Sequence, residues 1–197
     1  MKVLVIGASG RLGAAAAEAL ADRHEVLQAS RSGELTVDLT DAGSVEDLLQ
    51  QVGKLDAVVA CTGAVPFKPL ADLSEEDFKA GFMDKVLGQV NLVRLATPYL
   101  NDGGSFTLTT GVLAREPINT GVVASLANGA LESFVMAAAA ELPRGLRINA
   151  VSPSVLEEAT NYHDYFPGFT KVPAEAVGQA YLKSVEGIQT GRVFSLG

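Results

Sequence analysis

The sequence has few of the residues that would support a disulfide framework, a metal centre or a nucleic-acid surface. Its 197 residues include one cysteine, two histidines and no tryptophan, and acidic residues outnumber basic ones by 23 to 15, which gives a net charge of −8. The single cysteine excludes an internal disulfide, and no His/Cys cluster predicts a metal site. The negative balance disfavours nucleic acid, whose phosphates attract a basic surface. We therefore expect no metal and no nucleic-acid partner.

Long apolar runs are scarce as well. The first one, Val3–Ile6, is too short for the core of a signal peptide. No stretch approaches the roughly 18 apolar residues that a membrane span needs. No repeat, low-complexity tract or linker interrupts the chain. These features predict one domain over residues 1–197, located in the cytoplasm and without membrane contact. Hydrophobic residues still make up 48% of the chain, enough for a sizeable core.

The apolar residues alternate between short strand-like runs and longer helix-like segments. Asp41 and the pair Ser74/Asp77 are placed to cap two of the helices. Such alternation predicts an α/β fold, a doubly wound parallel sheet of Rossmann-like type in three layers. The expected strands cover residues 2–6, 25–29, 35–37, 56–60, 105–109, 146–151 and 192–195, and the expected helices 11–22, 41–52, 74–80, 82–100, 121–142 and 173–185.

A glycine-rich loop follows the first expected strand and opens the first expected helix. It reads Gly7-Ala8-Ser9-Gly10-Arg11-Leu12-Gly13. Glycines let the backbone turn tightly and approach a pyrophosphate, and the helix N-terminus attracts that anion. The Gly-x-x-Gly-x-x-Gly spacing is less specific than Gly-x-Gly-x-x-Gly, so a turn that binds nothing is the alternative. The residues that we expect to contact a dinucleotide are Gly7, Ser9, Gly10, Arg11, Leu12 and Gly13.

The end of the second expected strand indicates which dinucleotide is preferred. Sites for NAD usually carry an acid there that bonds the ribose 2′-hydroxyl, whereas this chain has Ser30-Arg31-Ser32. Arg31, joined by Arg11, can bind a 2′-phosphate instead, and one charge-assisted hydrogen bond contributes about 1.5–3 kcal/mol. This pattern favours NADP(H) over NAD(H), with solvated surface arginines as the alternative.

Several further segments resemble the short-chain dehydrogenase/reductase family over nearly the whole chain. Asp38-Leu39-Thr40-Asp41 resembles the segment that holds the adenine ring, and Cys61-Thr62-Gly63-Ala64 stands where the family has Asn-Asn-Ala-Gly. Residues 147–153 are similar to Arg-Val-Asn-x-Val-x-Pro, with Ser154 in place of the glycine that follows. The resemblance implies contacts to the adenosine and the nicotinamide from Asp38, Leu39, Thr62, Gly63, Ala64, Pro153 and Val155.

The catalytic residues of that family are replaced. Thr110 is the counterpart of the substrate-orienting serine, but Ala124 stands at the tyrosine position and Asn128 at the lysine position. Lys85, in turn, stands where the family carries an asparagine on the neighbouring helix. We therefore hypothesise that Lys85 and Asn128 form an exchanged pair near the nicotinamide ribose, with Thr110 orienting the substrate. The alternative is that Lys85 is a solvated or partner-facing helix residue.

Without the tyrosine, reduction of a ketone lacks its proton donor. Tyr162, His163 or Tyr165 can supply a proton if their segment covers the site, and the alternative is a packed surface lid without chemistry. The resemblance implies an NADP(H)-dependent oxidoreductase with a rearranged active site that acts on a small carbonyl or alcohol. The alternatives are a catalytically inactive NADP(H)-binding sensor or regulatory protein, and an isomerase or lyase that uses the nucleotide structurally. The sequence does not identify the substrate.

The two long expected helices, 82–100 and 121–142, carry apolar residues beyond a single stripe, which favours burial on two sides. Members of the family pair these helices across a dimer axis, so the resemblance implies a homodimer or homotetramer. The alternative is that both faces are covered inside one subunit. The apolar residues concerned are Val86, Val90, Val93 and Leu95 on the first helix and Val122, Leu126, Phe134 and Met136 on the second.

Overall fold

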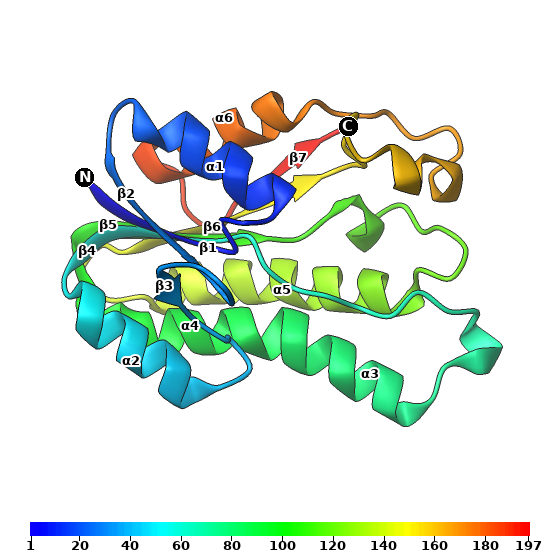
Figure 1. The fold of residues 1–197 in the computed structure, drawn as a ribbon, viewed down its shortest axis with the longest axis horizontal. Helices are drawn as coiled ribbons and strands as arrows, with labels where there is room; N and C mark the ends of the chain where they lie inside the picture. The colour runs from blue at the N-terminus through cyan, green and yellow to red at the C-terminus, as the bar shows by residue number, and fades with distance from the viewer.

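Seven parallel strands lie side by side in one sheet of the computed structural model, which describes residues 1–197 (Figure 1). Their order across the sheet is β3-β2-β1-β4-β5-β6-β7. The predicted α/β class with a doubly wound parallel sheet is therefore confirmed. The strands are β1 (Lys2–Ile6), β2 (Glu25–Ser30), β3 (Leu35–Thr36), β4 (Leu55–Ala60), β5 (Leu100–Thr109), β6 (Arg147–Pro153) and β7 (Val193–Leu196).

Helices cover both faces of the sheet, so the fold has three layers (Figure 1). α1 (Arg11–Ala21) and α6 (Ala174–Glu186) lie on one face, and α2 (Ala42–Val52), α4 (Gly88–Ala96) and α5 (Val122–Glu141) lie on the other. β1 shows how the sequence builds both cores, because successive side chains of a strand point to opposite faces. Val3 and Val5 join the core under α1 and α6, whereas Leu4 and Ile6 join the other core.

The predicted helix caps are present. The Asp41 carboxylate accepts the Gly43 N–H at 2.9 Å, and Ser74 and Asp77 form a capping box at the start of α3 (Glu75–Gly81). Four short 3₁₀ segments that the sequence did not indicate connect the larger elements. They are η1 (Leu70–Asp72), η3 (Thr97–Tyr99), η4 (Val112–Ala114) and η5 (Thr160–Tyr165).

The prediction of one long helix over residues 82–100 is wrong. The segment begins with a π-helical stretch, η2 (Phe82–Leu87), continues as α4 and ends in η3. Pro98 ends the helical ladder because it has no N–H to donate, and Leu100 is already the first residue of β5. The π turn follows α3 directly, so α3, η2 and α4 form one continuous rod (Figure 1).

The expectation that no stretch is long and apolar enough to span a bilayer is wrong for one helix, α5. By length and composition this helix alone meets that criterion, because alanine, valine and leucine outweigh its few polar residues. In this fold it lies against the sheet, with Leu131 and Val135 fully buried. Its outer side exposes Leu126 and Met136.

The order of the strands places the functional site. β1 lies between β2 and β4, so the chain winds away from it in both directions. Ligands of such sheets bind outside the carboxyl ends of the strands at this switch point. Gly7 follows β1, Arg31 follows β2 and Cys61 follows β4 at that edge.

Candidate cofactor and active site

Two cavities open at the carboxyl edge of the sheet and meet at Gly63 and Ala64, which line both. The first has a volume of about 360 Å³ and is formed by the segments after β1, β2 and β4 together with residues 37–40. The second has a volume of about 440 Å³ and is formed by η2, η4, α5, the end of β6 and η5. Both volumes lie in the range of small-molecule sites.

The glycine loop forms a cradle in which side chains have no room. A Cβ atom on Gly7, whose φ is +81°, would lie 2.5 Å from the Cys61 carbonyl oxygen. A Cβ atom on Gly13 would lie 2.1 Å from the Gly7 carbonyl oxygen, so α1 can approach the loop only because both residues are glycine. Gly10 precedes α1 without a side-chain cap, which leaves the first N–H groups of the helix for an anion.

The loop residues divide into two groups. Gly7, Ser9 and Gly10 line the first cavity. Arg11, Leu12 and Gly13, which the sequence also assigned to the cofactor, lie in the first turn of α1 and do not line it. Gly13 instead provides close packing between α1 and the loop.

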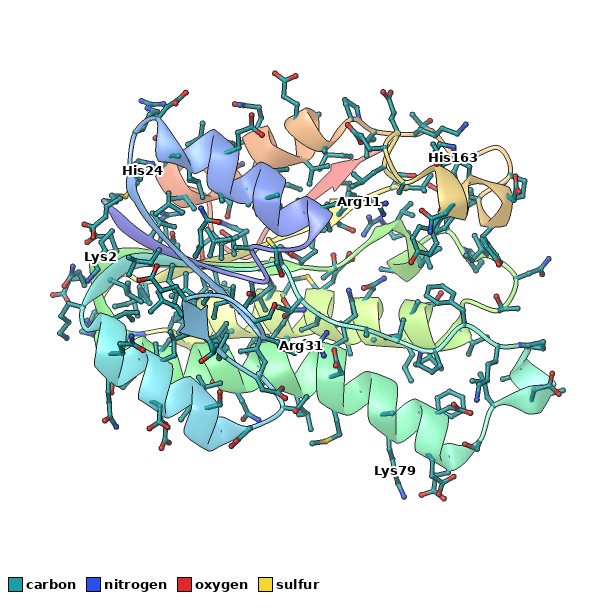
Figure 2. All side chains as sticks on the ribbon, in the orientation of Figure 1. Lys2, Arg11, His24, Arg31, Lys79 and His163 are labelled. Carbon is teal, nitrogen blue, oxygen red and sulfur yellow. The ribbon has the colours of Figure 1, made fainter.

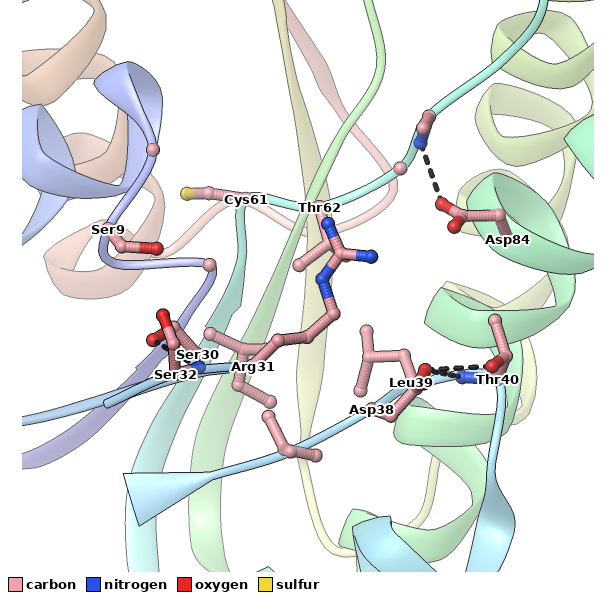
Figure 3. Close-up of a pocket in the computed structure, with 16 residues that line it drawn as sticks. Ser9, Ser30, Arg31, Ser32, Asp38, Leu39, Thr40, Cys61, Thr62 and Asp84 are labelled. Carbon is pink, nitrogen blue, oxygen red and sulfur yellow. Dashed lines mark hydrogen bonds between the residues drawn. The ribbon is translucent and has the colours of Figure 1, made fainter. Parts of the chain in front are cut away.

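The rim of the first cavity is polar and includes one arginine. Figure 3 shows the Arg31 side chain extending into the cavity from the segment Ser30–Ser32. The Asp38 carboxylate accepts the Thr40 N–H at 2.9 Å and the Thr40 hydroxyl at 2.7 Å. These two bonds, with a smaller contribution from the Arg31 charge, lower the pKa of Asp38. The Asp38 carboxylate is thus hydrogen-bonded within its own loop.

The structure brings four further residues that were predicted for the adenosine half to one cavity. Leu39, Thr62, Gly63 and Ala64 all line the first cavity. The Thr62 hydroxyl is buried and has no hydrogen-bond partner. Arg11 is exposed at the start of α1, outside the cavity, and Arg31 projects from the end of β2 (Figure 2).

Cys61 lines the first cavity, but its environment keeps the thiol inert. Burial raises the pKa of Cys61 to about 11, so the thiol is protonated at neutral pH and is a poor nucleophile. It lies beside Tyr181 and Thr109. The Thr109 hydroxyl contacts the Ala60 carbonyl oxygen at 2.6 Å and the Tyr181 hydroxyl at 2.7 Å.

The π turn η2 contacts the segment Gly63–Ala64, which lies between the two cavities. The Asp84 carboxylate accepts the Ala64 N–H at 2.7 Å, and a Cβ atom on Gly63 would lie 2.5 Å from the Lys85 Cγ. One turn later the buried Gln89 amide donates to the Thr109 carbonyl oxygen at 3.1 Å and accepts the Thr109 N–H at 3.0 Å. Consecutive residues of the turn therefore face different cavities, Asp84 the first and Lys85 the second.

Lys85 and Asn128 are brought together in the second cavity. Lys85 is 9% exposed and forms no ion pair, and Asn128 is 4% exposed with an amide oxygen that has no partner. Burial lowers the pKa of Lys85 to about 8, although the Asp84 charge opposes this shift. No hydrogen bond joins the two side chains, which line one cavity from η2 and α5.

Thr110 lines neither cavity. Its hydroxyl donates to the Glu132 carboxylate at 3.0 Å, which also binds Arg115 at 2.6 and 2.8 Å. The Ser152 hydroxyl completes this cluster with a bond to Glu132 at 3.1 Å. Because the Thr110 proton is held by a carboxylate, orienting a substrate would require the hydroxyl to rotate, and that role stays a prediction.

The segment after β6 contributes part of the second cavity. Pro153 and Val155 line it, as does the half-exposed Tyr162. His163 instead contacts the Leu156 carbonyl oxygen through Nε2 at 2.9 Å, and Tyr165 lines a separate hollow. Of the three proton donors that the sequence offers in this segment, only Tyr162 faces the cavity.

Three polar residues of the site were not predicted from the sequence. Asp84 and Gln89 could not be found because their orientation depends on the π turn, which no residue pattern announced. Ser154 was noted only as a replaced glycine, yet it lines the second cavity and its buried hydroxyl has no partner. The rest of the wall is largely apolar and includes Val65, Phe67, Val112, Leu113, Ala124 and Phe166.

Comparisons with known proteins place the chain among dehydrogenases and reductases. A family model described as "Enoyl-(Acyl carrier protein) reductase" matches residues 1–191. An uncharacterized oxidoreductase of Methylorubrum extorquens is 33% identical over 150 residues, which cover 75% of this chain and 57% of that protein. A hydroxynaphthalene reductase of Aspergillus fumigatus is 30% identical over 145 residues, covering 70% and 53%. The chain thus spans little more than half the length of these two relatives.

Two solved structures share the whole fold. Protein lin1944 from Listeria innocua is 47% identical, with a TM-score of 0.98 and full coverage of both chains. A small-chain dehydrogenase in complex with NADPH is 26% identical, with a TM-score of 0.88 and coverage of 100% of this chain and 96% of the other. Chains of similar size therefore adopt this architecture, and one of them binds NADPH.

Proposed function

Because the chain belongs to the short-chain dehydrogenase/reductase family, we propose that it is an NADP(H)-dependent oxidoreductase of a small carbonyl or alcohol. The observation that carries the proposal is the pair of cavities that meet at Gly63 and Ala64. One offers a glycine cradle and an uncapped helix N-terminus to a pyrophosphate, and the other offers Lys85 and Asn128. The unpartnered polar atoms of Thr62, Asn128 and Ser154 fit a dinucleotide and substrate that would satisfy them.

The preference for NADP(H) rests on Arg31. Its side chain lines the first cavity between two serines, where an NAD site would carry an acid. The nearest acid of that cavity, Asp38, is held by Thr40. A 2′-phosphate would therefore meet a guanidinium and two hydroxyls, and the NADPH complex of the structural neighbour supports the same assignment.

The second cavity is suited to a carbonyl group. A bound reduced nicotinamide supplies the hydride for such a reaction. The chain contributes a largely apolar wall, and Lys85 and Asn128, beside Ser154 and Tyr162, are polar groups on that wall that can hold a carbonyl oxygen. Ala124, at the position of the family's tyrosine, lines the cavity without any polar atom in its side chain.

The apolar wall also bears on the substrate. Val65, Phe67 and Phe166 offer aliphatic and aromatic surface, and only Lys85 carries a charge. A relative named hydroxynaphthalene reductase acts, by its name, on a fused aromatic ring. We therefore choose apolar ketones, with 1-tetralone as a fused-ring example, as the first substrates to try.

Calorimetric titrations with NADPH and NADH, beside assays of NADPH oxidation with 1-tetralone, acetophenone and 2-butanone, test the proposal. We expect NADPH to bind about tenfold or more tightly than NADH. We also expect at least one ketone to consume it. NADPH binding without turnover would favour the second candidate, an NADP(H) sensor, which the loss of the tyrosine at Ala124 supports. Failure to bind either nucleotide would overturn both.

We also propose that the chain forms a homodimer through the outer side of α5. Leu126 is 50% exposed and Met136 59% exposed there, and Leu126 borders an apolar hollow with Phe78, Phe82 and Met83. A second copy offers the same apolar surface in return. Light scattering should give the mass of a dimer for the wild type and of a monomer for Leu126→Glu; equal masses would contradict this interface.

We also propose that the protein is located in the cytoplasm. Its single thiol, Cys61, suits that reducing compartment.

A further inference from the structure

Lys85 is the only charged side chain on the wall of the second cavity. It is nine-tenths buried, and its aliphatic part lies so close to Gly63 that a Cβ atom at position 63 would collide with it. Asn128, across the cavity, presents an amide oxygen without a partner. A buried ammonium is costly unless it is paired or has a ligand to meet, so the arrangement points to a polar group between these two side chains.

None of the titratable groups of the surrounding elements forms an ion pair with this ammonium. Asp84, on the same turn, accepts the Ala64 N–H and acts on Lys85 only through its charge. Glu132, on α5, holds Arg115 in an ion pair. Cys61, which follows β4, lines the other cavity, and Tyr162 lines this one from η5. Lys85 is therefore a cation without a direct ion pair, and the Asp84 charge is the one that acts on it.

The π turn explains why this lysine reaches the cavity. Insertion of a π turn changes the direction in which the following side chains point, and such turns are frequent at functional sites. Here it directs Asp84 to one side of the Gly63–Ala64 segment and Lys85 to the other. By contrast Lys79, on α3 just before the turn, points to solvent and pairs with Glu75 (Figure 2).

We propose that Lys85 is the proton donor of the carbonyl reduction, in place of the tyrosine that the chain lacks, with Asn128 positioning the same oxygen or the ammonium. This inference rests on the proposed oxidoreductase function. The carbonyl carbon takes up the hydride that reduced nicotinamide provides, and the electron pair of the C=O π bond takes the proton from Nζ of Lys85. The products are the alcohol, oxidised nicotinamide and a neutral amine, which regains its proton from water.

Tyr162 is the competing donor in the same cavity. It lies on a short 3₁₀ segment and is 47% exposed, whereas Lys85 is held on a helical rod and is 9% exposed. A donor fixed by packing keeps its geometry, and burial brings the pKa of Lys85 to about 8, near the pH at which proton transfer is needed. The two residues give different predictions when each is replaced.

The experiment compares the wild type with Lys85→Met, Lys85→Arg and Tyr162→Phe, and with Lys79→Met as the matched control for a lost lysine. Single-turnover reduction of 1-tetralone by bound NADPH gives the rate, and calorimetry gives the NADPH affinity. Independently of activity, the ¹³Cε resonance of Lys85, identified by its absence from Lys85→Met, is followed from pH 6 to pH 11.

We expect Lys85→Met and Lys85→Arg to slow reduction by about 100-fold or more, Tyr162→Phe to slow it by less than about tenfold, and Lys79→Met to leave it unchanged. Arginine does not rescue because its guanidinium does not release a proton. The wild-type rate should fall above about pH 8, with the midpoint of the Lys85 resonance. Full activity of Lys85→Met, or loss of activity in Tyr162→Phe alone, overturns the inference and leaves the proposed function standing. A wild type that binds NADPH but reduces nothing overturns both.

Discussion

The two cavities differ in what builds them. The first is shaped mainly by backbone, since Gly7 and Gly10 line it and Gly13 lets the uncapped N-terminus of α1 pack closely against their loop. The second is shaped by side chains, among them Ala124 and Asn128, which the resemblance assigns to the positions of the family's tyrosine and lysine. If the proposed function holds, the backbone half recognises the nucleotide and the side-chain half sets the chemistry, so variants of each half should have separable effects.

The largest expected effect comes from filling the backbone half. Gly13→Val should destabilise the protein by about 3 kcal/mol or more, because even its Cβ atom would lie 2.1 Å from the Gly7 carbonyl oxygen. NADPH binding should be lost with it. Urea unfolding and calorimetry measure the two effects.

The matched control is Gly129→Ala on α5, where an added Cβ meets nothing within 4 Å. It should stabilise the helix by about 0.5–1 kcal/mol. If Gly13→Val bound NADPH as the wild type does, the cradle would not be the nucleotide site, and the contrast between the two halves would disappear.

In the side-chain half, by contrast, replacement of the buried Lys85 should stabilise the protein. Lys85→Met is expected to raise the free energy of unfolding at pH 7 by about 3 kcal/mol, because the pKa of Lys85 is about 8 in the fold and about 10.4 in the unfolded chain. The unfolded state holds the proton more tightly, so the wild type gains stability between about pH 8 and 10.4 and the difference shrinks there. Urea unfolding at pH 7 and pH 10.5 measures it.

A constant difference over that pH range, or a Lys85→Met variant less stable at pH 7, would show that the ammonium is solvated in the fold. That result would contradict the assignment of Lys85 to a buried position in the cavity wall. Lys79→Met serves as the control for the loss of an exposed lysine.

The smallest effect separates the two nucleotides within the backbone half. Arg31→Ala should weaken NADPH binding by about 1.5–3 kcal/mol and leave NADH binding unchanged, because only NADPH has the 2′-phosphate. Arg94→Ala, an exposed arginine on α4, is the control for a lost charge. If Arg31→Ala weakened the binding of NADPH and of NADH equally, Arg31 would contact a part of the cofactor that the two nucleotides share.

The sequence predicted the fold well wherever a local pattern determines the structure. Strands such as β1 and caps such as Asp41 were predicted because alternation and side-chain bonding act within a few residues. The π turn was missed because an apolar helical stretch looks the same with or without one extra residue in a turn. The end of α4 was also misplaced, although Pro98 stands close to it.

The candidate site follows the same division. Gly7 and Arg31 could be predicted from the chain order of a parallel sheet, since they follow strands that meet at one edge, whereas Gly63 was predicted from the family resemblance. The expected meeting of Lys85 and Asn128 in one cavity came from a resemblance in pattern. That Thr110 turns to Glu132, and that Asp84 holds Ala64, depends on long-range packing that no local signal contains.

The central claim, that this chain moves a hydride within its second cavity, is tested most directly by an isotope. The wild type is incubated with 1-tetralone and with NADPH carrying deuterium at C4, on either face in separate experiments, and the alcohol is analysed by mass spectrometry. The account predicts an alcohol with one deuterium from one of the two labelled forms. Bound NADPH that remains unoxidised, with no labelled alcohol from either form, would contradict it.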